Sequence, residues 1–419
     1  MIRFYNGKTL ENGALTDNEV WVDGSRIAYV GPAKTEMPPF ERQINLSGNL
    51  LMPGFKNTHT HSAMTFLRSL ADDQPLQQWL FESVFPREAR LSGEAVYAFT
   101  KLAFLEYIAN GITSCFDMYF YPDDFIRAAT DMGFRAVICE SFTAGNDVSV
   151  APERFEKYNR IHPLISYRLG FHAEYTGTEE MLQKISEISH QLRQPVWSHN
   201  SETASEVQDC IDRHGMTPTA YFDSLGLYDY GGGGFHCVYF TDEDLQIFKK
   251  RGCTAVLNAG SNAKLASGIA PFKRFVDSGV NLAIGTDGPA SNNALDFFRE
   301  MHLINVLAKL QEQNAAAGDP SLVLQAAVAQ GARAVGLTDC DDIAPGKQAD
   351  MIVIDMNRPN MRPVHNILKN LIYSGNPSNV KMTMIAGKIL YENGEFFVGE
   401  PVKTIYSRAE RLAYAITTE

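Results

Sequence analysis

The sequence has few features of an extracellular, disulfide-bonded protein. Its 419 residues include only six cysteines, which are scattered along the chain and never form a Cys-x-x-Cys pair. Several of these cysteines lie in apolar runs, which favours buried thiols in a reducing compartment over disulfides. Residues 1–7 also lack the charged-then-apolar layout of a signal peptide. We therefore expect a cytoplasmic protein.

Clustered positive charge and long apolar runs are absent as well. The formal net charge is -12, and the lysines and arginines form no cluster, so neither nucleic acid nor an anionic membrane is an expected partner. No apolar run approaches the roughly 18 residues that a spanning helix needs. The composition, with 45% hydrophobic and 21% charged residues, is ordinary for a globular protein. The length suffices for one large domain and a small one.

Both ends of the sequence have the pattern of short β-strands. Residues 19–31 alternate between apolar and polar side chains around an Asp-Gly turn, which predicts a hairpin. A similar texture of strands and turns returns near the other end of the chain. The two ends are expected to pair into a small β-sandwich domain from residues 1–52 and 346–402. A helix is predicted for residues 403–419.

Between these ends, short apolar runs alternate with longer helical segments. Eight strand–helix units are expected within residues 53–345. Continuous apolar runs, such as residues 280–285, are typical of parallel strands that are covered on both faces. Eight such units indicate an α/β fold of the (β/α)8 TIM-type barrel kind rather than an open sheet. The strands are expected near residues 54–59, 112–117, 135–140, 165–172, 195–199, 234–238, 253–258 and 281–286.

Two histidines stand at the end of the first expected barrel strand. His59 and His61 are two residues apart, so an extended backbone points both imidazoles to the same side. Such a pair can chelate a borderline metal ion such as zinc. A His-x-His pair is also common without a metal, so the interpretation depends on further ligands from other strands.

More titratable side chains occur where other barrel strands are expected to end. In barrels of this type the C-terminal ends of the strands form one rim, which carries the active site. Each of these residues can also be an ordinary packed or hydrogen-bonded side chain, and Asp287 can be a helix N-cap. Their convergence on one rim favours a shared site. They are His172, His199, Glu202, His236 and Asp287.

Three imidazoles and a carboxylate form a suitable site for Zn2+, with Fe2+ as an alternative. Such a metal lowers the pKa of bound water towards about 7 and supplies hydroxide at neutral pH. A carboxylate that is not a ligand, such as Glu202, can carry protons, and His236 can polarise or position the attacked atom. These parts predict metal-assisted hydrolysis at an sp2 carbon.

As a set, the motifs resemble the amidohydrolase superfamily and, within it, the branch of methylthioadenosine/S-adenosylhomocysteine deaminases and chlorohydrolases. The likeness extends almost from end to end of the chain. The matching segments are residues 53–61 (PGFKNTHTH), 198–203 (SHNSET), 235–237 (FHC), 261–262, 268–271, 285–293 (GTDGPASNN) and 343–350 (IAPGKQAD).

The resemblance implies roles for these residues. Asp287 would take a proton from the metal-bound water, and protonated Asp287 would then help ammonia to leave. Glu202 would protonate the ring nitrogen beside the attacked carbon, while His236 would hydrogen-bond the hydroxide or the tetrahedral intermediate. The implied ligands of the single metal are His59, His61, His199 and Asp287.

The resemblance also implies substrate contacts. Glu88 matches the position that binds ribose hydroxyls, and His172 matches a further substrate contact. Trp79 belongs to the same entrance segment, where it can equally be a packing residue.

The sequence departs from this branch in two places. Glu140 stands where the enzymes that accept S-adenosylhomocysteine carry an arginine for the amino-acid carboxylate, and residues 143–150 contain no clear counterpart of a second arginine. A carboxylate at this place would repel a substrate carboxylate. Residues 256–262 also differ from the His-Asn-Pro of relatives. Deamination is therefore better supported than any particular substrate.

We predict a metal-dependent deaminase of an adenine nucleoside, such as methylthioadenosine, 5'-deoxyadenosine, adenosine or S-adenosylhomocysteine. Glu88 favours a ribose, whereas Glu140 disfavours the homocysteine tail. The alternatives are deamination of a free base such as guanine or a pterin, dechlorination of an s-triazine, or a catalytically inactive binding barrel. The expected partner is a small-molecule substrate, and the resemblance leaves a homodimer or higher homo-oligomer open.

Overall fold

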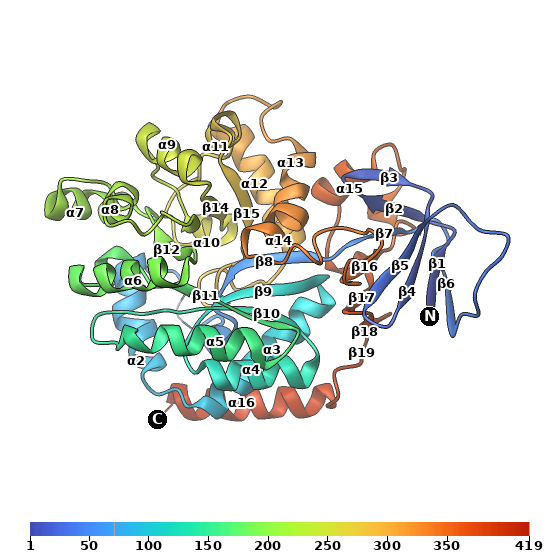
Figure 1. The fold of residues 1–419 in the computed structure, drawn as a ribbon, viewed down its shortest axis with the longest axis horizontal. Coiled ribbons are helices and arrows are strands. Elements are labelled where there is room, and N and C mark those ends of the chain that lie inside the picture. The colour runs from blue at the N-terminus through green and yellow to red at the C-terminus, as the bar shows by residue number, and fades with distance from the viewer. Residues whose placement is uncertain (71, 419) are drawn as a thin grey trace.

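A sheet of eight parallel strands forms the centre of the computed structural model, which describes residues 1–70 and 72–418. The strands follow one another around the sheet in chain order, and helices cover the outside (Figure 1). This architecture confirms the predicted (β/α)8 barrel. The strands are β8 (Phe55–Thr60), β9 (Ile112–Met118), β10 (Arg135–Cys139), β11 (Ile165–Gly170), β12 (Val196–Asn200), β13 (Gly232–His236), β14 (Thr254–Leu257) and β15 (Asn281–Ile284).

The first and last strands meet and close the barrel. The hydroxyl of Thr58 donates to the carbonyl of Ile284 at 2.7 Å. Just beyond the strand end, the backbone N–H of Asp287 donates to the carbonyl of His59 at 3.0 Å. Closure therefore brings two predicted site residues, far apart in sequence, to the same point on the rim.

The barrel helices begin and end at residues suited to those positions. Thr203 and Glu206 form a capping box at the start of α7, and Gly215 ends this helix with a φ of 69°. The helices are α3 (Gly93–Ala109), α4 (Pro122–Met132), α5 (Ala151–Ile161), α6 (Glu179–Leu192), α7 (Ala204–His214), α8 (Pro218–Ser224), α9 (Asp242–Arg251), α10 (Ala259–Lys264), α11 (Phe272–Ser278), α12 (Phe297–Gln311), α13 (Pro320–Gln325) and α14 (Gly331–Ala334).

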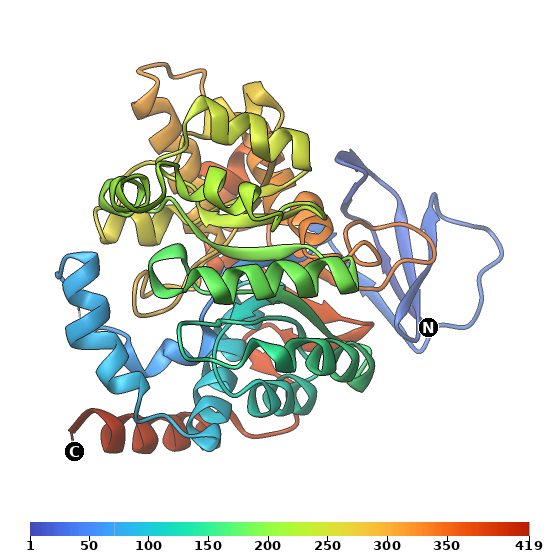
Figure 2. The ribbon, with the colours of Figure 1, turned by 60° about the vertical axis from the view of Figure 1, so that its left-hand side comes forward.

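A helical arm lies between β8 and α3. It is the light-blue helix that stands apart from the barrel strands in Figure 2, and we call residues 76–88 the entrance arm. It consists of α1 (Leu76–Gln78), the π-helix η2 (Trp79–Val84) and α2 (Phe85–Glu88). The arm carries two of the predicted substrate contacts, Trp79 and Glu88.

Large apolar side chains fill the inside of the barrel. Trp197, Phe235 and Phe116 are fully buried there, and the rings of Trp197 and Phe235 stack with centroids 6.0 Å apart. The ring of His59 stacks on this core, with its centroid 3.8 Å from that of the Phe235 ring. The barrel is therefore a packed core with its polar site at one rim, not a pore.

Strands from both termini form a small β-sandwich beside the barrel (Figure 1). One sheet has the order β5 (Arg26–Gly31), β4 (Glu19–Asp23), β1 (Ile2–Tyr5), β6 (Arg42–Asn45). The other has the order β19 (Glu395–Phe396), β18 (Lys388–Glu392), β17 (Val380–Ile385), β16 (Met351–Ile354), β7 (Leu50–Pro53), β2 (Lys8–Glu11), β3 (Ala14–Thr16).

The two termini share the core of this sandwich. Phe4 and Val20 from the first sheet pack with Leu51 and Met384 from the second in one buried cluster. Strand β7 pairs with β16, so that Leu51 lies opposite Val353. The predicted sandwich from both chain ends is present, while the exact domain boundaries at 52, 53, 345, 346, 402 and 403 remain a prediction.

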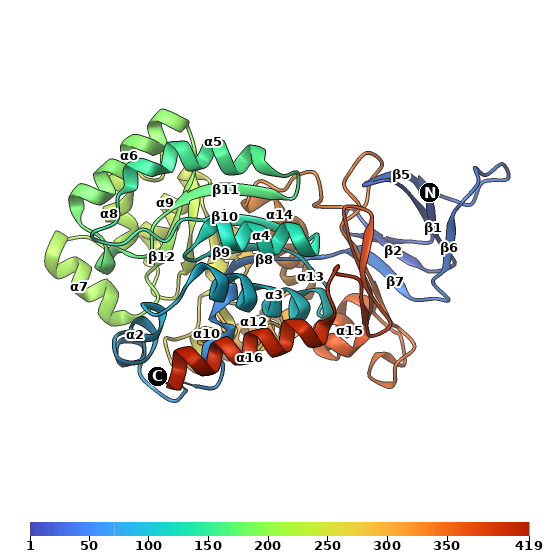
Figure 3. The ribbon, with the colours of Figure 1, turned by 90° about the horizontal axis from the view of Figure 1, so that it is seen from below.

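The chain ends in a long helix, α16 (Val402–Thr418). Figure 3 shows it lying along α3 on the outside of the barrel. Ile405, Ala409 and Ile416 are buried, which is the face that the sequence pattern predicts, although Leu412 is only half-buried. Residue 419 of the predicted helix lies outside the described residues.

A buried ion pair joins the barrel to the sandwich. Arg135 on β10 donates through Nε to Oδ2 of Asp350 at 2.5 Å and through Nη2 to Oδ1 at 3.0 Å. The side chain of Asp350 is fully buried and also accepts the backbone N–H of Ala386 at 2.8 Å. Loss of either charge would leave its partner buried without compensation, which is costly.

We expect the substitution Asp350→Asn to lower the free energy of unfolding by about 3 kcal/mol, because it leaves the Arg135 charge unpaired in the interior. Urea unfolding followed by tryptophan fluorescence measures the change. The matched control is Asp339→Asn, because Asp339 pairs with Arg26 on the surface and should contribute less than about 1 kcal/mol. Equal effects of the two substitutions would contradict the structural role of the buried pair.

Candidate functional site

The predicted metal ligands come together at the rim formed by the C-terminal ends of the barrel strands. His59 and His61 extend from β8 with ring centroids 4.8 Å apart, and the ring of His199 from β12 lies 4.9 Å from that of His59. Asp287 follows β15, and its Oδ1 lies 3.4 Å from Nε2 of His59 and 3.2 Å from Nε2 of His61. The four side chains therefore surround one small space.

Backbone carbonyls orient two of the three imidazoles. Nδ1 of His61 lies 2.6 Å from the carbonyl of Met118, and Nδ1 of His199 lies 2.7 Å from the carbonyl of His172. A carbonyl can only accept, so each Nδ1 carries a proton, and each ring in its neutral form offers the lone pair of Nε2. This arrangement is typical of histidines that bind a metal through Nε2.

Asp287 is held from the side away from these histidines. Its Oδ2 accepts the hydroxyls of Ser261 at 2.6 Å and Ser291 at 2.8 Å. Its Oδ1, which also accepts the N–H of Gly288 at 2.7 Å, is the oxygen that faces the imidazoles. Burial raises the pKa of this carboxyl, but the neighbouring imidazoles of His59 and His61 outweigh that effect and hold its pKa well below the usual range.

His59 provides the test of whether a metal fits this site. Its two ring nitrogens are both buried and have no hydrogen-bond partner in the described part of the chain. Burial lowers the pKa of His59 to about 3, so its imidazole is neutral and can act as a ligand. Because a buried polar atom without a partner is costly, the ring nitrogen that carries the lone pair fits a bound cation.

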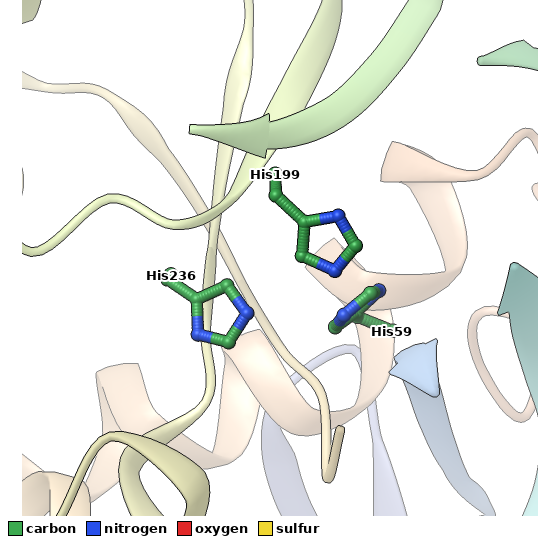
Figure 4. Close-up of side chains that lie close together, drawn as sticks. All are labelled: His59, His199 and His236. Carbon is green, nitrogen blue, oxygen red and sulfur yellow. The ribbon is translucent and has the colours of Figure 1, made fainter. Parts of the chain in front are cut away.

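Two groups of potential ligands share His59. Figure 4 shows one of them, His59, His199 and His236, with the three rings gathered around a common space. The other consists of His59, His61 and Asp287, and in each group the ligand atoms lie within 4.8 Å of one another. The site thus offers more donors than a tetrahedral ion needs, and the assignment of four of them as ligands remains a prediction.

Asp287 also influences the protonation of His61. Burial lowers the pKa of His61, but the hydrogen bond and charge of Asp287 outweigh burial and raise the pKa to about 9. A proton and a metal ion therefore compete for this imidazole, and metal binding is expected to release a proton.

His236, the last residue of β13, faces the site from a polar environment. Its Nδ1 donates to Oδ1 of Asn262 at 2.7 Å, which leaves Nε2 on the site side, 3.8 Å from Oε2 of Glu202. Its hydrogen bond to Asn262 fixes the tautomer that can accept a proton at Nε2. The role of His236 beside the reacting atoms remains a prediction.

Glu202 follows β12 and points into the same space. Burial raises the pKa of Glu202 above its ordinary value, and the hydroxyl of Ser267 donates to its Oε1 at 3.1 Å. The backbone of this turn is held by the carboxylate of Glu206, which accepts the N–H groups of Ser201 at 2.9 Å and Glu202 at 2.7 Å. A buried carboxyl with a raised pKa suits a general acid.

These groups line a narrow inner pocket of about 70 Å³. The predicted substrate contacts Trp79, Glu88 and His172 line the same pocket. Its walls therefore place the proton-transfer groups beside the predicted substrate contacts.

The three predicted substrate contacts have distinct environments. The hydroxyl of Tyr119 donates to Oε1 of Glu88 at 2.6 Å, and burial raises the pKa of Glu88. The ring of His172 lies 4.7 Å from that of His199, with its Nδ1 2.9 Å from the hydroxyl of Thr176. Trp79 is buried on the entrance arm. Their roles towards a substrate remain predictions.

Several supporting residues were not among those predicted. Tyr119 lies just beyond β9, so the rule that strand ends carry the site could have found it. Ser261 and Asn262 were recognised as a motif, but their contacts with Asp287 and His236 depend on the folded structure. Ser267 has no signal in the sequence that sets it apart from other serines.

The structure shows that the charge of Glu140, which the sequence left without a partner, is paired. The carboxylate lies just beyond β10, but it is not isolated, because Nη1 of Arg154 on α5 donates to its Oε1 at 2.7 Å. Arg154 lies beyond residues 143–150, where the sequence shows no counterpart of the second arginine. Both residues line a larger outer cavity of about 870 Å³.

Among the helices of residues 1–70 and 72–418, none is long and apolar enough to cross a membrane.

Comparison with known proteins gives consistent matches over most of the chain. Residues 50–390 match the sequence model of the Amidohydrolase family. The chain is 34% identical to a 5-methylthioadenosine/S-adenosylhomocysteine deaminase of Thermoanaerobacter pseudethanolicus, over 96% of this chain and 95% of the relative. It is 36% identical to a 5'-deoxyadenosine deaminase of Methanothermobacter thermautotrophicus, over 97% of both chains.

A solved structure has the same fold throughout. It is an adenosine deaminase from Xanthomonas campestris with bound zinc, with a TM-score of 0.94 and 32% sequence identity. The alignment covers 100% of this chain and 99% of the other. The match therefore includes the barrel, the sandwich and the C-terminal helix.

Metal content will distinguish the predicted ligands from His236. For protein purified without chelators, we expect about one transition-metal ion per chain, and less than about 0.1 for the substitutions His59→Asn and His199→Asn, because each removes a ligand. The matched variant His236→Asn should keep its metal, because His236 is predicted to contact the substrate side. Mass spectrometry of the metals and circular dichroism of each variant measure this. Loss of the metal from His236→Asn would make His236 a ligand instead.

Proposed function

Because the chain belongs to the amidohydrolase family, we propose that it is a metal-dependent deaminase that removes the amino group of an adenine nucleoside as ammonia. The proposal is supported by relatives that act on methylthioadenosine, S-adenosylhomocysteine and 5'-deoxyadenosine and match this chain over nearly its whole length. The single observation that supports it most is the convergence of five side chains on one inner pocket: His61, His199, Glu202, His236 and Asp287.

The proposed cofactor is one divalent ion, with zinc as the first choice and Fe2+ as the alternative. It would be held by His59, His61, His199 and Asp287, and the orphaned nitrogens of His59 support this placement. When bound, such an ion acts as a Lewis acid towards water. A zinc-bound adenosine deaminase of the same fold supports the choice of metal.

The residues of the chain supply the proton transfers. Glu202, with its raised pKa, donates a proton to the ring nitrogen beside the carbon that carries the amino group. Asp287 takes a proton from the attacking water and passes it to the leaving ammonia. The remaining hydroxyl proton returns to Glu202 when the product carbonyl forms. His236 hydrogen-bonds the oxygen that adds to the ring. Its Nε2 is available for this bond on the site side, 3.8 Å from Oε2 of Glu202. Both carboxyls are buried, where such interactions are strong.

In this proposal Glu88 makes the enzyme prefer nucleosides to free bases, because it binds the ribose. Tyr119 occupies its Oε1, so Oε2 remains to accept the hydroxyls of a ribose. The inner pocket is small, about 70 Å³, and Glu88 lines both this pocket and the outer cavity. If the base occupies the inner pocket, the attached ribose would therefore contact Glu88 where the two cavities join.

We also propose a reducing compartment such as the cytoplasm. All six cysteines are buried and unpaired as thiols, and burial raises the pKa of Cys115 and Cys139 well above the ordinary value. Such thiols are unreactive and agree with the scattered cysteines of the sequence.

An ammonia-release screen over adenosine, 5'-deoxyadenosine, methylthioadenosine, adenine, guanine, a pterin and an s-triazine tests the proposal. The metal-loaded protein should deaminate the adenine nucleosides, and Glu202→Gln should lower kcat by about 10²–10⁴-fold because it cannot donate the proton. Its metal content should not change. Turnover of free bases or triazines alone would favour those alternatives, and no turnover would favour an inactive barrel.

The ribose role of Glu88 has its own test. We expect Glu88→Ala to lower kcat/KM for adenosine by about 10–100-fold, because a charged acceptor for the ribose hydroxyls is lost. The matched variant Tyr119→Phe keeps the carboxylate and should have a smaller effect. An unchanged kcat/KM for Glu88→Ala would show that the sugar does not contact this residue.

A further inference from the structure

The outer cavity offers a place for whatever the nucleoside carries at its 5' end. It measures about 870 Å³ and shares Glu88, Tyr119 and Tyr175 with the inner pocket. A nucleoside with its base at the metal centre and its ribose on Glu88 would direct its 5' carbon into this cavity. The cavity therefore determines which 5' groups are accepted.

Aromatic side chains form part of the wall of this cavity. Phe81, Phe85, Phe120 and Phe142 are among its lining residues. Aromatic faces gain free energy by removing apolar groups from water, and they pair poorly with a carboxylate. This part of the wall suits a methylthio group or a similar uncharged substituent.

An ion pair forms another part of the wall of the same cavity. Glu140 is buried, with a side-chain exposure of 7%, whereas the side chain of Arg154 is 34% exposed. Nη1 of Arg154 donates to Oε1 of Glu140 at 2.7 Å. The buried partner is the carboxylate, and the guanidinium is the group that a ligand in the cavity can reach.

Glu140 changes what Arg154 can offer to a ligand. A free guanidinium is a strong site for a carboxylate, because it combines charge with paired donors. A guanidinium already bound to a buried carboxylate forms a neutral pair, which attracts a second carboxylate much less. A substrate carboxylate would then lose its hydration without a matching gain.

We infer that Glu140 is a specificity-determining residue: by engaging Arg154, it makes the outer cavity select adenine nucleosides with an uncharged 5' group over those whose 5' tail ends in a carboxylate. The inference rests on the proposed function and narrows its substrate class to compounds such as methylthioadenosine, 5'-deoxyadenosine and adenosine. S-adenosylhomocysteine, with its amino-acid tail, is the disfavoured member.

The experiment compares kcat/KM for S-adenosylhomocysteine with kcat/KM for methylthioadenosine in each variant of the metal-loaded protein. Glu140→Gln keeps the shape of the side chain but removes its charge, and so leaves the Arg154 charge uncompensated. We expect the ratio to rise about tenfold or more, because Arg154 can then pair with the substrate carboxylate. The control Glu153→Gln removes a charge from an exposed neighbour on α5 and should change the ratio less than twofold.

A double variant keeps the test decisive if Glu140→Gln folds poorly. Glu140→Gln with Arg154→Gln replaces the pair by two neutral side chains, and its ratio should stay within about threefold of the unmodified protein because the pair is already neutral. A selective loss of S-adenosylhomocysteine turnover in the double variant would overturn the inference, because Arg154 would then already serve a carboxylate.

An unchanged ratio of the two kcat/KM values in a folded Glu140→Gln variant would also overturn the inference about Glu140. In that case methylthioadenosine is still deaminated, so the proposed function stands while the inference fails. Absence of turnover of both nucleosides by the unmodified protein would instead refute the proposed function itself.

Discussion

The neutral imidazole of His59 imposes the constraint on which the site depends. Both of its ring nitrogens are buried, and neither has a hydrogen-bond partner among the described residues. The burial of polar atoms without partners costs several kcal/mol unless another group compensates. His59 also belongs to both groups of potential metal ligands. A cation bound at this ring would account for an otherwise unfavourable arrangement at the centre of the rim.

The barrel determines which side chains can meet His59. Its closure joins β8 to β15 and brings Asp287 to within 3.4 Å of the His59 ring, while β12 contributes His199 from across the rim. Ser261 and Ser291 then hold the outer oxygen of Asp287. Because packed strands and short hydrogen bonds fix these groups before any ligand binds, the site is preorganised.

The strand pattern and the strand ends were predictable from the sequence, since parallel barrel strands are apolar throughout and their C-terminal ends form one rim. The spacing of His59 and His61 and the position of His199 followed from this. Contacts that depend on how loops and helices pack were not predictable. The pairing of Glu140 with Arg154 needs α5, which packs against β11, to bring Arg154 to the end of β10, and no local pattern around either residue indicates that.

Diffraction at the zinc absorption edge, from crystals of the protein purified without chelators, tests the central claim most directly. The account predicts one anomalous peak at the rim, about 2.0–2.2 Å from Nε2 of each ligating histidine and from an Asp287 oxygen. The ligating histidines would be His59, His61 and His199. The absence of a peak there from well-ordered crystals, or a metal bound away from His59, would contradict it.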